Sequence, residues 1–385
     1  MTSLDELVSA LHSWYPPATA EDWDAVGLVY GDPAQQVRKV MLAVDVDEAV
    51  AAEAVAWGAD LLVVHHPLFL TPVHGFAATT PKGRTLSRLA AAGCALLVAH
   101  TNADQAVGGV SEALAHALGL SELEPILPGH AAPYDKLTVT VPTDAAAPVR
   151  AAIAEAGAGA IGTYDHCTFS VAGQGRFRPL EGSQPTIGTV GDIAVVEEER
   201  VEAVLPRRLR RQVVAALLAA HPYEVPAYDV VELADPQALV SGTGRIGVVE
   251  RATLGAFAQV VADALPATEG GVRVAGDPTR SVRRIAVCGG AGDFLLDRLA
   301  ASDVDVYVTS DLRHHRAAEF VAAGGPALVD VSHWAAEWTW LPVVQRRVQD
   351  AFGDKVDVRV SELRTDPWQF RTVSTDPADR TERSE

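Results

Sequence analysis

The chain has 385 residues, of which 48% are apolar, so it is long enough for two or three folded domains. Its formal net charge of -19 excludes a general nucleic-acid or anionic-membrane surface, because the overall field repels polyanions. Three scattered cysteines without CxxC spacing indicate a reducing compartment. The sequence contains no run of 18 apolar residues, so no membrane span is predicted. We therefore expect a cytoplasmic protein.

The first 127 residues alternate short apolar runs with Ala-rich stretches, a pattern typical of a mostly parallel α/β sheet. The predicted strands are 37–45, 61–64 and 94–100, with helices at 47–59 and 83–93. Polar residues stand at the strand ends, at Asp45, His65 and His100. In open α/β sheets the ligand crevice lies outside the carboxyl ends of the strands, so this edge is the predicted working face.

Two adjacent histidines, His65 and His66, follow the apolar run LLVV at the end of its predicted strand. Neighbouring residues on an extended chain point to opposite faces, unlike residues four apart on a helix. The pair is therefore poorly arranged to chelate one ion, but it can reach two neighbouring ions.

The pattern of apolar residues changes over residues 128–240. The apolar pattern there predicts strand, helix, two strands, helix and strand, which is the order of a ferredoxin-like α+β domain. We interpret this segment as an inserted domain with borders near Pro128 and Pro236. The basic run at 206–214 is interpreted as a charged face of its second helix.

Residues 282–315 repeat the plan of residues 37–66, and residues 322–337 echo residues 90–104. Segments 1–127 and 241–372 are thus predicted to be related halves of one α/β core whose strand ends share a cleft. The charged tail at 373–385 is expected to be disordered.

Three groups of ligand-type residues stand at these predicted ends: His65 with His66, His100 to Asp104, and His333 with Glu337. A histidine and a glutamate four apart face the same side of a helix. Nitrogen and oxygen donors suit zinc, iron or manganese, and a shared Glu337 carboxylate would let two ions hold one water. Taken alone, each short pattern also fits a solvated helix face.

Two further motifs lie in the second half. His314 and His315, beside Asp311, are candidates for proton transfer in the cleft. CGGAGD at 288–293 lacks the full GxGxxG pattern and the Walker lysine, so a tight strand-to-helix turn is favoured over phosphate binding.

These segments together resemble the GTP cyclohydrolase I type 2-like, or Nif-three-like, family of dinuclear-metal proteins. The motifs that carry the resemblance are AEDWDAVGLVYGDP, DLLVVHHPLF, AHTNADQAVGG, AHPYEVPAYDV, RIAVCGGAGD, DVYVTSDLRHH and SHWAAEW. They occur in this order over nearly the whole chain. The chain departs from the family's usual residues at Ala25, at Ser310 within Thr-Ser-Asp, and at Ser332.

The resemblance implies a set of five metal ligands: His65, His66, Asp104, His333 and Glu337. It also implies that Glu337 contacts both of two divalent ions, with His66 and Asp104 favouring one ion and His65 and His333 the other. An α/β core of two related halves, a ferredoxin-like insert and a homohexamer with internal metal sites are implied as well.

The functional hypothesis is a metal-dependent hydrolase, with Glu337 holding both ions and His315 as an acid or base. The resemblance implies ring opening of GTP, and another small phosphorylated substrate fits the same site chemistry. The alternative is a non-catalytic metal-binding, assembly or regulatory protein.

Overall fold

The computed structural model describes residues 2–129, 134–161, 164–234 and 240–372. The tail predicted at 373–385 lies outside these ranges. The chain divides into two compact units: unit 1 comprises Met1–Gly129 with Ala238–Glu385, and unit 2 comprises His130–Gln237. Among the helices of the described ranges, none combines the length and the apolar character needed to cross a membrane.

Unit 1 contains a five-stranded sheet with the order β19-β4-β5-β6-β2. Its strands are β19 (Asp357–Val360), β4 (Lys39–Ala43), β5 (Leu61–Val64), β6 (Ala95–Val98) and β2 (Gly27–Tyr30). The first four strands are parallel, and β2 runs antiparallel to β6. The predicted parallel strands are therefore present, and they are short and apolar on both faces because helices cover both sides.

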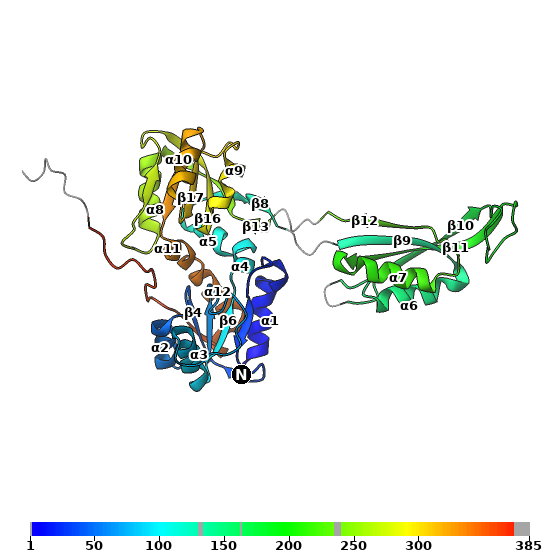
Figure 1. Ribbon diagram of the computed structural model, residues 1–385, viewed down its shortest axis with the longest axis horizontal. Helices are drawn as coiled ribbons and strands as arrows, with labels where there is room; N and C mark the ends of the chain where they lie inside the picture. The colour runs from blue at the N-terminus through cyan, green and yellow to red at the C-terminus, as the bar shows by residue number, and fades with distance from the viewer. Residues whose placement is uncertain (1, 130–133, 162–163, 235–239, 373–385) are drawn as a thin grey trace, which may run out of the picture. The chain divides into compact units, whose positions relative to one another are not determined.

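Alternation of side chains along β4 divides the core at this sheet. Met41 packs with α2 (Glu48–Trp57) and α3 (Pro81–Ala91), whereas Leu42 packs with α1 (Leu4–Trp14) and α12 (Leu341–Phe352). Figure 1 shows α2 and α3 on one side of this sheet and α1 on the other. Asp47 begins α2 by accepting hydrogen bonds from two backbone N–H groups, and Gly58 ends it in a left-handed conformation.

The second sheet of unit 1 has six strands in the order β15-β18-β17-β16-β14-β7. They are β15 (Arg273–Ala275), β18 (Ala327–Val331), β17 (Val306–Ser310), β16 (Ser281–Ala291), β14 (Arg245–Thr253) and β7 (Ser121–Glu124). Strands β16, β17 and β18 are parallel, and the edge pairings are antiparallel. α5 (Val110–Ala117), α8 (Leu254–Ala264) and α11 (His333–Trp338) contribute to the core on one face, and α9 (Leu296–Leu299) and α10 (His314–Ala322) to the core on the other.

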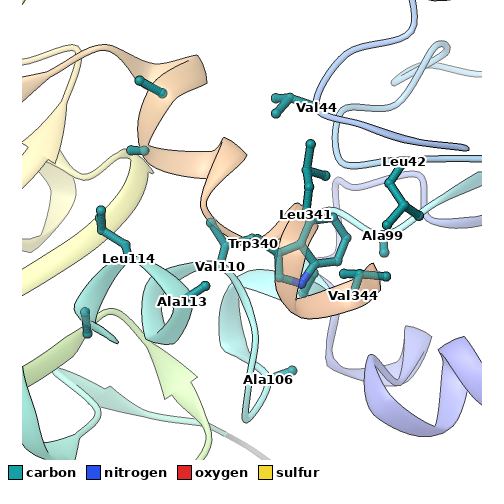
Figure 2. Close-up of a cluster of buried hydrophobic side chains, with 14 of the residues drawn as sticks. Leu42, Val44, Ala99, Ala106, Val110, Ala113, Leu114, Trp340, Leu341 and Val344 are labelled. Carbon is teal, nitrogen blue, oxygen red and sulfur yellow. The ribbon is translucent and has the colours of Figure 1, made fainter. Parts of the chain in front are cut away.

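One continuous apolar core joins the two sheets of unit 1. Trp340, which is 1% exposed, lies at its centre together with Leu341. Figure 2 shows these side chains between Leu42 and Ala99 on one side and Val110 and Ala113 on the other. The start of α12 thus fixes the two sheets against each other.

The glycine-rich sequence CGGAGD contains the predicted strand-to-helix turn, but the turn begins later than the motif does. Its first four residues, Cys288 to Ala291, still belong to β16, and they are followed by a 3-10 turn, Asp293–Leu295, and the single-turn α9. The strand continues because Ala291 pairs with Ser310 and the Thr309 hydroxyl donates to the Gly290 carbonyl at 3.1 Å. The motif therefore lines the sheet and does not start a long helix.

Unit 2 has a four-stranded antiparallel sheet in the order β10-β11-β9-β12. Its strands are β9 (Tyr134–Pro142), β10 (Thr168–Phe177), β11 (Ala194–Pro206) and β12 (Tyr228–Glu232). Helices α6 (Ala146–Glu155) and α7 (Arg210–Ala220) pack on one face through a separate apolar core. Along the chain the order is strand, helix, two strands, helix and strand.

Candidate metal centre

His65 is held in one orientation directly after β5. Its backbone N–H donates to the carbonyl of Val44 at 3.1 Å, and its Nδ1 lies 2.9 Å from the carbonyl of Ala99. A carbonyl can only accept, so Nδ1 carries a proton and Nε2 is the ring atom left to bind a metal ion. The ring is fully buried, and Nε2 has no hydrogen-bond partner among the described residues.

Three other histidines are oriented by a carboxylate in the same way. The Nδ1 atoms lie 2.7 Å from Asp45 in His66, 2.6 Å from Asp311 in His333 and 2.8 Å from Asp24 in His100. A carboxylate behind Nδ1 fixes the ring and leaves Nε2 as the outward donor atom, an arrangement typical of metal-binding histidines. Asp311 adopts a left-handed φ of 58°, which is uncommon outside glycine.

Glu337 lies between the histidines. Its Oε1 is 2.8 Å from Nε2 of His333 and 3.4 Å from Nε2 of His65, and its Oε2 is 3.0 Å from Nε2 of His66. The spacing of four residues along α11 places His333 and Glu337 on one side of that helix. Ser332 begins α11 by accepting a hydrogen bond from the backbone of Ala335.

Asp104 completes the cluster from α4 (Thr101–Gln105). Its Oδ1 lies 3.7 Å from Nε2 of His65, and this oxygen is buried without a hydrogen-bond partner among the described residues. Oε2 of Glu337 is also buried, and its contact is with Nε2 of His66 at 3.0 Å. Buried acceptor atoms that converge without donors are costly, unless a cation or protons lie between them. This donor set therefore fits a divalent metal ion.

The charges of the cluster are strongly coupled. Burial alone would raise the pKa of Glu337, but His66, His65 and His333 outweigh it and hold that pKa well below its ordinary value. Burial likewise lowers the pKa of His66, but Glu337 and Asp45 outweigh it and raise this pKa to about 11. Without a cation, the carboxylates thus hold protons on the imidazoles, and a metal ion would replace those protons.

A cavity of about 660 Å³ opens beside this cluster. It is lined by His66, Asp311 and His333, and by the chain segment that follows β19. In that segment Thr365 donates a hydrogen bond to Asp45, the carboxylate behind His66. Asp366 accepts one from Ser332 at the start of α11. The segment therefore holds the Asp45 carboxylate behind His66 and the start of helix α11, and both of these support the cluster.

Comparison with known proteins decides the family. The profile of Duf34/NIF3 (NGG1p interacting factor 3) matches residues 2–367. The chain belongs to the Duf34/NIF3 family. A Mycobacterium tuberculosis relative named GTP cyclohydrolase 1 type 2 homolog is 49% identical over 371 residues, covering 95% of this chain and 97% of its own. A Bacillus subtilis relative of the same name is 37% identical over 369 residues, covering 95% and 98%.

Solved structures of similar proteins agree. A Bacillus cereus protein related to NIF3 has a TM-score of 0.69 and 38% identity, with 96% of this chain and 99% of that one covered. A Staphylococcus aureus protein has a TM-score of 0.76 and 26% identity over the same shares. The resemblance predicted from the sequence motifs is confirmed.

In this Duf34/NIF3 protein the five predicted ligands lie together, and His315 lies apart from them. His315 is exposed on the first turn of α10, with its ring 5.1 Å from that of His314, and it is not among the residues that line the cavity. The strand β17 ends at Ser310, so Asp311 occupies the position next to the cluster. The double histidine comes three residues later and faces outward.

The division of the ligands between two ions that the resemblance implied stays a prediction, and the distances show only which side chains are neighbours. His65 lies beside Asp104, and the ring of His66 lies 5.2 Å from that of His333. Among the described residues, two groups have ligand atoms within 4.8 Å of one another: His65, His66 and His100, and His66, His333 and Glu337. His100 is thus an additional candidate donor, and its position at the end of β6 was the sequence signal for it.

Proposed function

We propose that this Duf34/NIF3 protein is a metal-dependent hydrolase whose two divalent ions share Glu337. The observation that carries the proposal is the convergence of buried ligand atoms of His65, Asp104 and Glu337, with Oδ1 of Asp104 and Oε1 of Glu337 at 3.7 and 3.4 Å from Nε2 of His65. The distances favour His65, Asp104 and Glu337 around one ion, and His66, His333 and Glu337 around the other. When bound, such an ion pair supplies a water of lowered pKa and polarises the substrate.

The chain's own residues prepare this site before any cation enters. Asp45 and Asp311 keep the protons of His66 and His333 on Nδ1, so both Nε2 atoms face Glu337. Glu337 directs each of its two oxygens to a different set of imidazoles. Little reorganisation is therefore needed on binding, which favours affinity and a fixed substrate geometry.

The cavity beside the cluster supports a phosphorylated, aromatic substrate. Trp368 and Phe370 are exposed aromatic side chains that line it, and Arg273 and Arg371 are cations in the same wall. Aromatic faces can stack on a purine, and guanidinium groups bind phosphate oxygens. We propose GTP ring opening, the reaction in the relatives' names, and a small phosphoester as the second candidate substrate.

The deciding experiment measures metals and turnover together. Purified full-length protein, resupplied with Zn²⁺, Fe²⁺ or Mn²⁺, is assayed by elemental analysis and then incubated with GTP and a panel of phosphoesters. Glu337→Ala and His66→Ala should each lose bound metal and lower kcat/KM by about 100-fold or more, because both remove a direct ligand. His74→Ala is the matched control, since His74 is exposed and outside the cluster.

The same assay separates the rival functions. Metal-loaded protein that turns over no substrate would contradict the hydrolase and favour a metal-binding or assembly protein. His315 is exposed and does not line the cavity, so its proposed role as acid or base requires that His315→Ala lowers turnover while the metal content stays unchanged. Unchanged turnover of that variant would remove His315 from the mechanism.

We further propose a ferredoxin-like identity for unit 2, a homohexameric assembly and a cytoplasmic location. The strand order β10-β11-β9-β12, with both helices on one face, supports the first. The family resemblance supports the second, and the buried free thiols of Cys94 and Cys288 support the third. Light scattering on purified protein should give six times the chain mass of 40.6 kDa.

A further inference from the structure

Unit 2 contains a cavity of about 580 Å³ on the face of its sheet that α6 and α7 leave uncovered. Alternation along β11 separates the two faces, because Val201, Ala203 and Leu205 pack against the helices while Glu198 and Arg200 line the cavity. Two loops form the wall opposite the sheet. The Thr186 hydroxyl donates to the carbonyl of Pro222 at 2.7 Å and ties these loops together.

Glu198 is the buried charge of this cavity. Glu198 is 6% exposed, and its Oε1 accepts a hydrogen bond of 2.8 Å from the Tyr223 hydroxyl. Nearby carboxylates on the same strand have cationic partners: Glu199 pairs with Arg150 and Glu202 with Lys136. Among the described residues, Glu198 has no such ion pair. A buried carboxylate without a cation is costly, so it favours a ligand that supplies one.

The cations that line the cavity do not neutralise Glu198 by contact. The Arg200 side chain is 53% exposed and binds Glu202 at 3.0 Å, and Arg176 is exposed. The innermost charge of the cavity is therefore negative.

Glycines on β10 keep the space beside this carboxylate open. Gly173 pairs directly with Glu198, and a Cβ added there would meet no atom within 4 Å. At Gly175, on the same face, an added Cβ would lie 2.2 Å from Oε2 of Glu198. A side chain at Gly175 would thus displace the carboxylate, and one at Gly173 would project into open space. The remaining lining is largely apolar, including Val171, Phe177 and Ile187.

We propose that this cavity binds a small organic cation, in which an amine or amidine group donates to Glu198 and an apolar body packs on the surrounding side chains. The site lies within unit 2, and it does not depend on the proposed hydrolase activity. Its ligand class follows from one buried negative charge that no lining cation contacts, with apolar side chains such as Val171, Phe177 and Ile187 around it.

Isothermal titration of the full-length protein with three isosteric probes tests the proposal. Benzamidine carries the cation, benzamide is its neutral analogue and benzoate its anionic one. Benzamidine should bind with one site per chain, and the other two should bind at least about tenfold more weakly. Absence of benzamidine binding, or equal binding of benzamide, would overturn the proposal.

Benzamidine binding to variants tests whether the ligand occupies this cavity. Glu198→Gln should weaken benzamidine binding by about tenfold or more, and its amide oxygen can still accept from Tyr223, so the fold is retained. Glu199→Gln, on the same strand but paired with Arg150 on the helix face, and His66→Ala in unit 1 should bind benzamidine as the wild type does. Gly173→Val should block binding by filling the cavity, without a clash in the strand. Wild-type affinity in Glu198→Gln or Gly173→Val contradicts the site.

Discussion

At the scale of single residues, the candidate metal centre depends on a glycine that lies outside the predicted ligand groups. Gly290 has a φ of 73°, and a Cβ added to it would lie 2.8 Å from Oε1 of Glu337 and 3.4 Å from Nε2 of His333. The β16 backbone can therefore approach the cluster only if this position carries no side chain. Glycine at this position allows the β16 backbone to approach the cluster closely and to adopt a left-handed conformation.

Gly290→Ala should lower metal affinity by about tenfold or more, because the new methyl group displaces Glu337 from its position between the histidines. Competition with a chromophoric chelator measures the affinity. Gly324→Ala is the matched control, since Gly324 has a similar φ of 81° but open space around its Cβ. If both variants lose affinity equally, backbone strain is the cause and contact with Glu337 is not.

The donors themselves could be predicted from the sequence, but their orienting partners could not. His333 and Glu337 are four residues apart, and helical spacing is enough to place them together. The partner of His100 is Asp24, which lies 76 residues earlier in the chain and is brought near only by the pairing of β2 with β6. The adjacent histidines His314 and His315 suggested a residue of the site. Because β17 already ends at Ser310, His315 lies on the exposed first turn of α10.

At the scale of elements, the start of α12 links the fold to the metal centre. The ring of Trp340 packs edge-on against Tyr15 at 5.3 Å and against His65 at 5.6 Å. The same residue therefore belongs to the core between the two sheets and to the support of a metal ligand.

Trp340→Ala should lower the free energy of unfolding by about 3–5 kcal/mol, as is usual for loss of a buried aromatic side chain, and it should weaken metal binding through His65. Urea denaturation with elemental analysis of the folded fraction measures both effects. Trp368→Ala is a suitable control, because that ring is 69% exposed. Unchanged stability in Trp340→Ala would show that the sheets are joined by other contacts.

In unit 2, the basic run at 206–214 proves to be more than a solvated helix face. Arg210 and Arg207 form ion pairs with Asp135 on β9 at 2.6 and 3.0 Å. The Arg210 hydrogen bond, with that of Arg207, holds the pKa of Asp135 below its ordinary value. A lowered pKa in the folded state contributes stability above the unfolded-state pKa of about 3.9, and this contribution is lost as pH falls through the folded-state pKa.

Asp135→Asn should therefore destabilise unit 2 at pH 7 by about 1–3 kcal/mol, with a difference from wild type that shrinks below pH 4. Hydrogen exchange of peptides from residues 134–232 measures the stability of this unit separately. Asp229→Asn on the neighbouring strand β12 is the control, because Asp229 is exposed. A difference that is independent of pH would contradict the assigned role of the charge.

At the scale of the whole molecule, the two sheets of unit 1 exchange edge strands. β19, from the second half of the sequence, pairs with β4, and β7, from the first half, pairs with β14. The candidate ligands come from both halves as well: His65, His66 and Asp104 from the first, His333 and Glu337 from the second. Binding of a metal ion by these residues is therefore expected to be coupled to the folding of unit 1.

Removal of metal should lower the thermal stability of unit 1 and leave unit 2 unchanged. A ligand present at about 1,000 times its Kd contributes about 4 kcal/mol, so chelation should lower the Tm by several degrees. All seven tryptophans lie in unit 1, so tryptophan fluorescence reports its unfolding, and hydrogen exchange follows unit 2. Equal loss of stability in both units, or none, would contradict the assignment of the metal site to unit 1.

The sequence by itself determined the local features of this protein. Short apolar runs specified the buried parallel strands, helical spacing joined His333 to Glu337, and the motifs identified the Duf34/NIF3 family, because each of these depends on neighbouring residues. Tertiary structure alone decided which carboxylate orients each histidine, how the strands are exchanged between the sheets, and that Asp311 rather than His315 reaches the cluster. Those features depend on contacts between residues far apart in the chain, and such contacts are fixed only when the sheets pack.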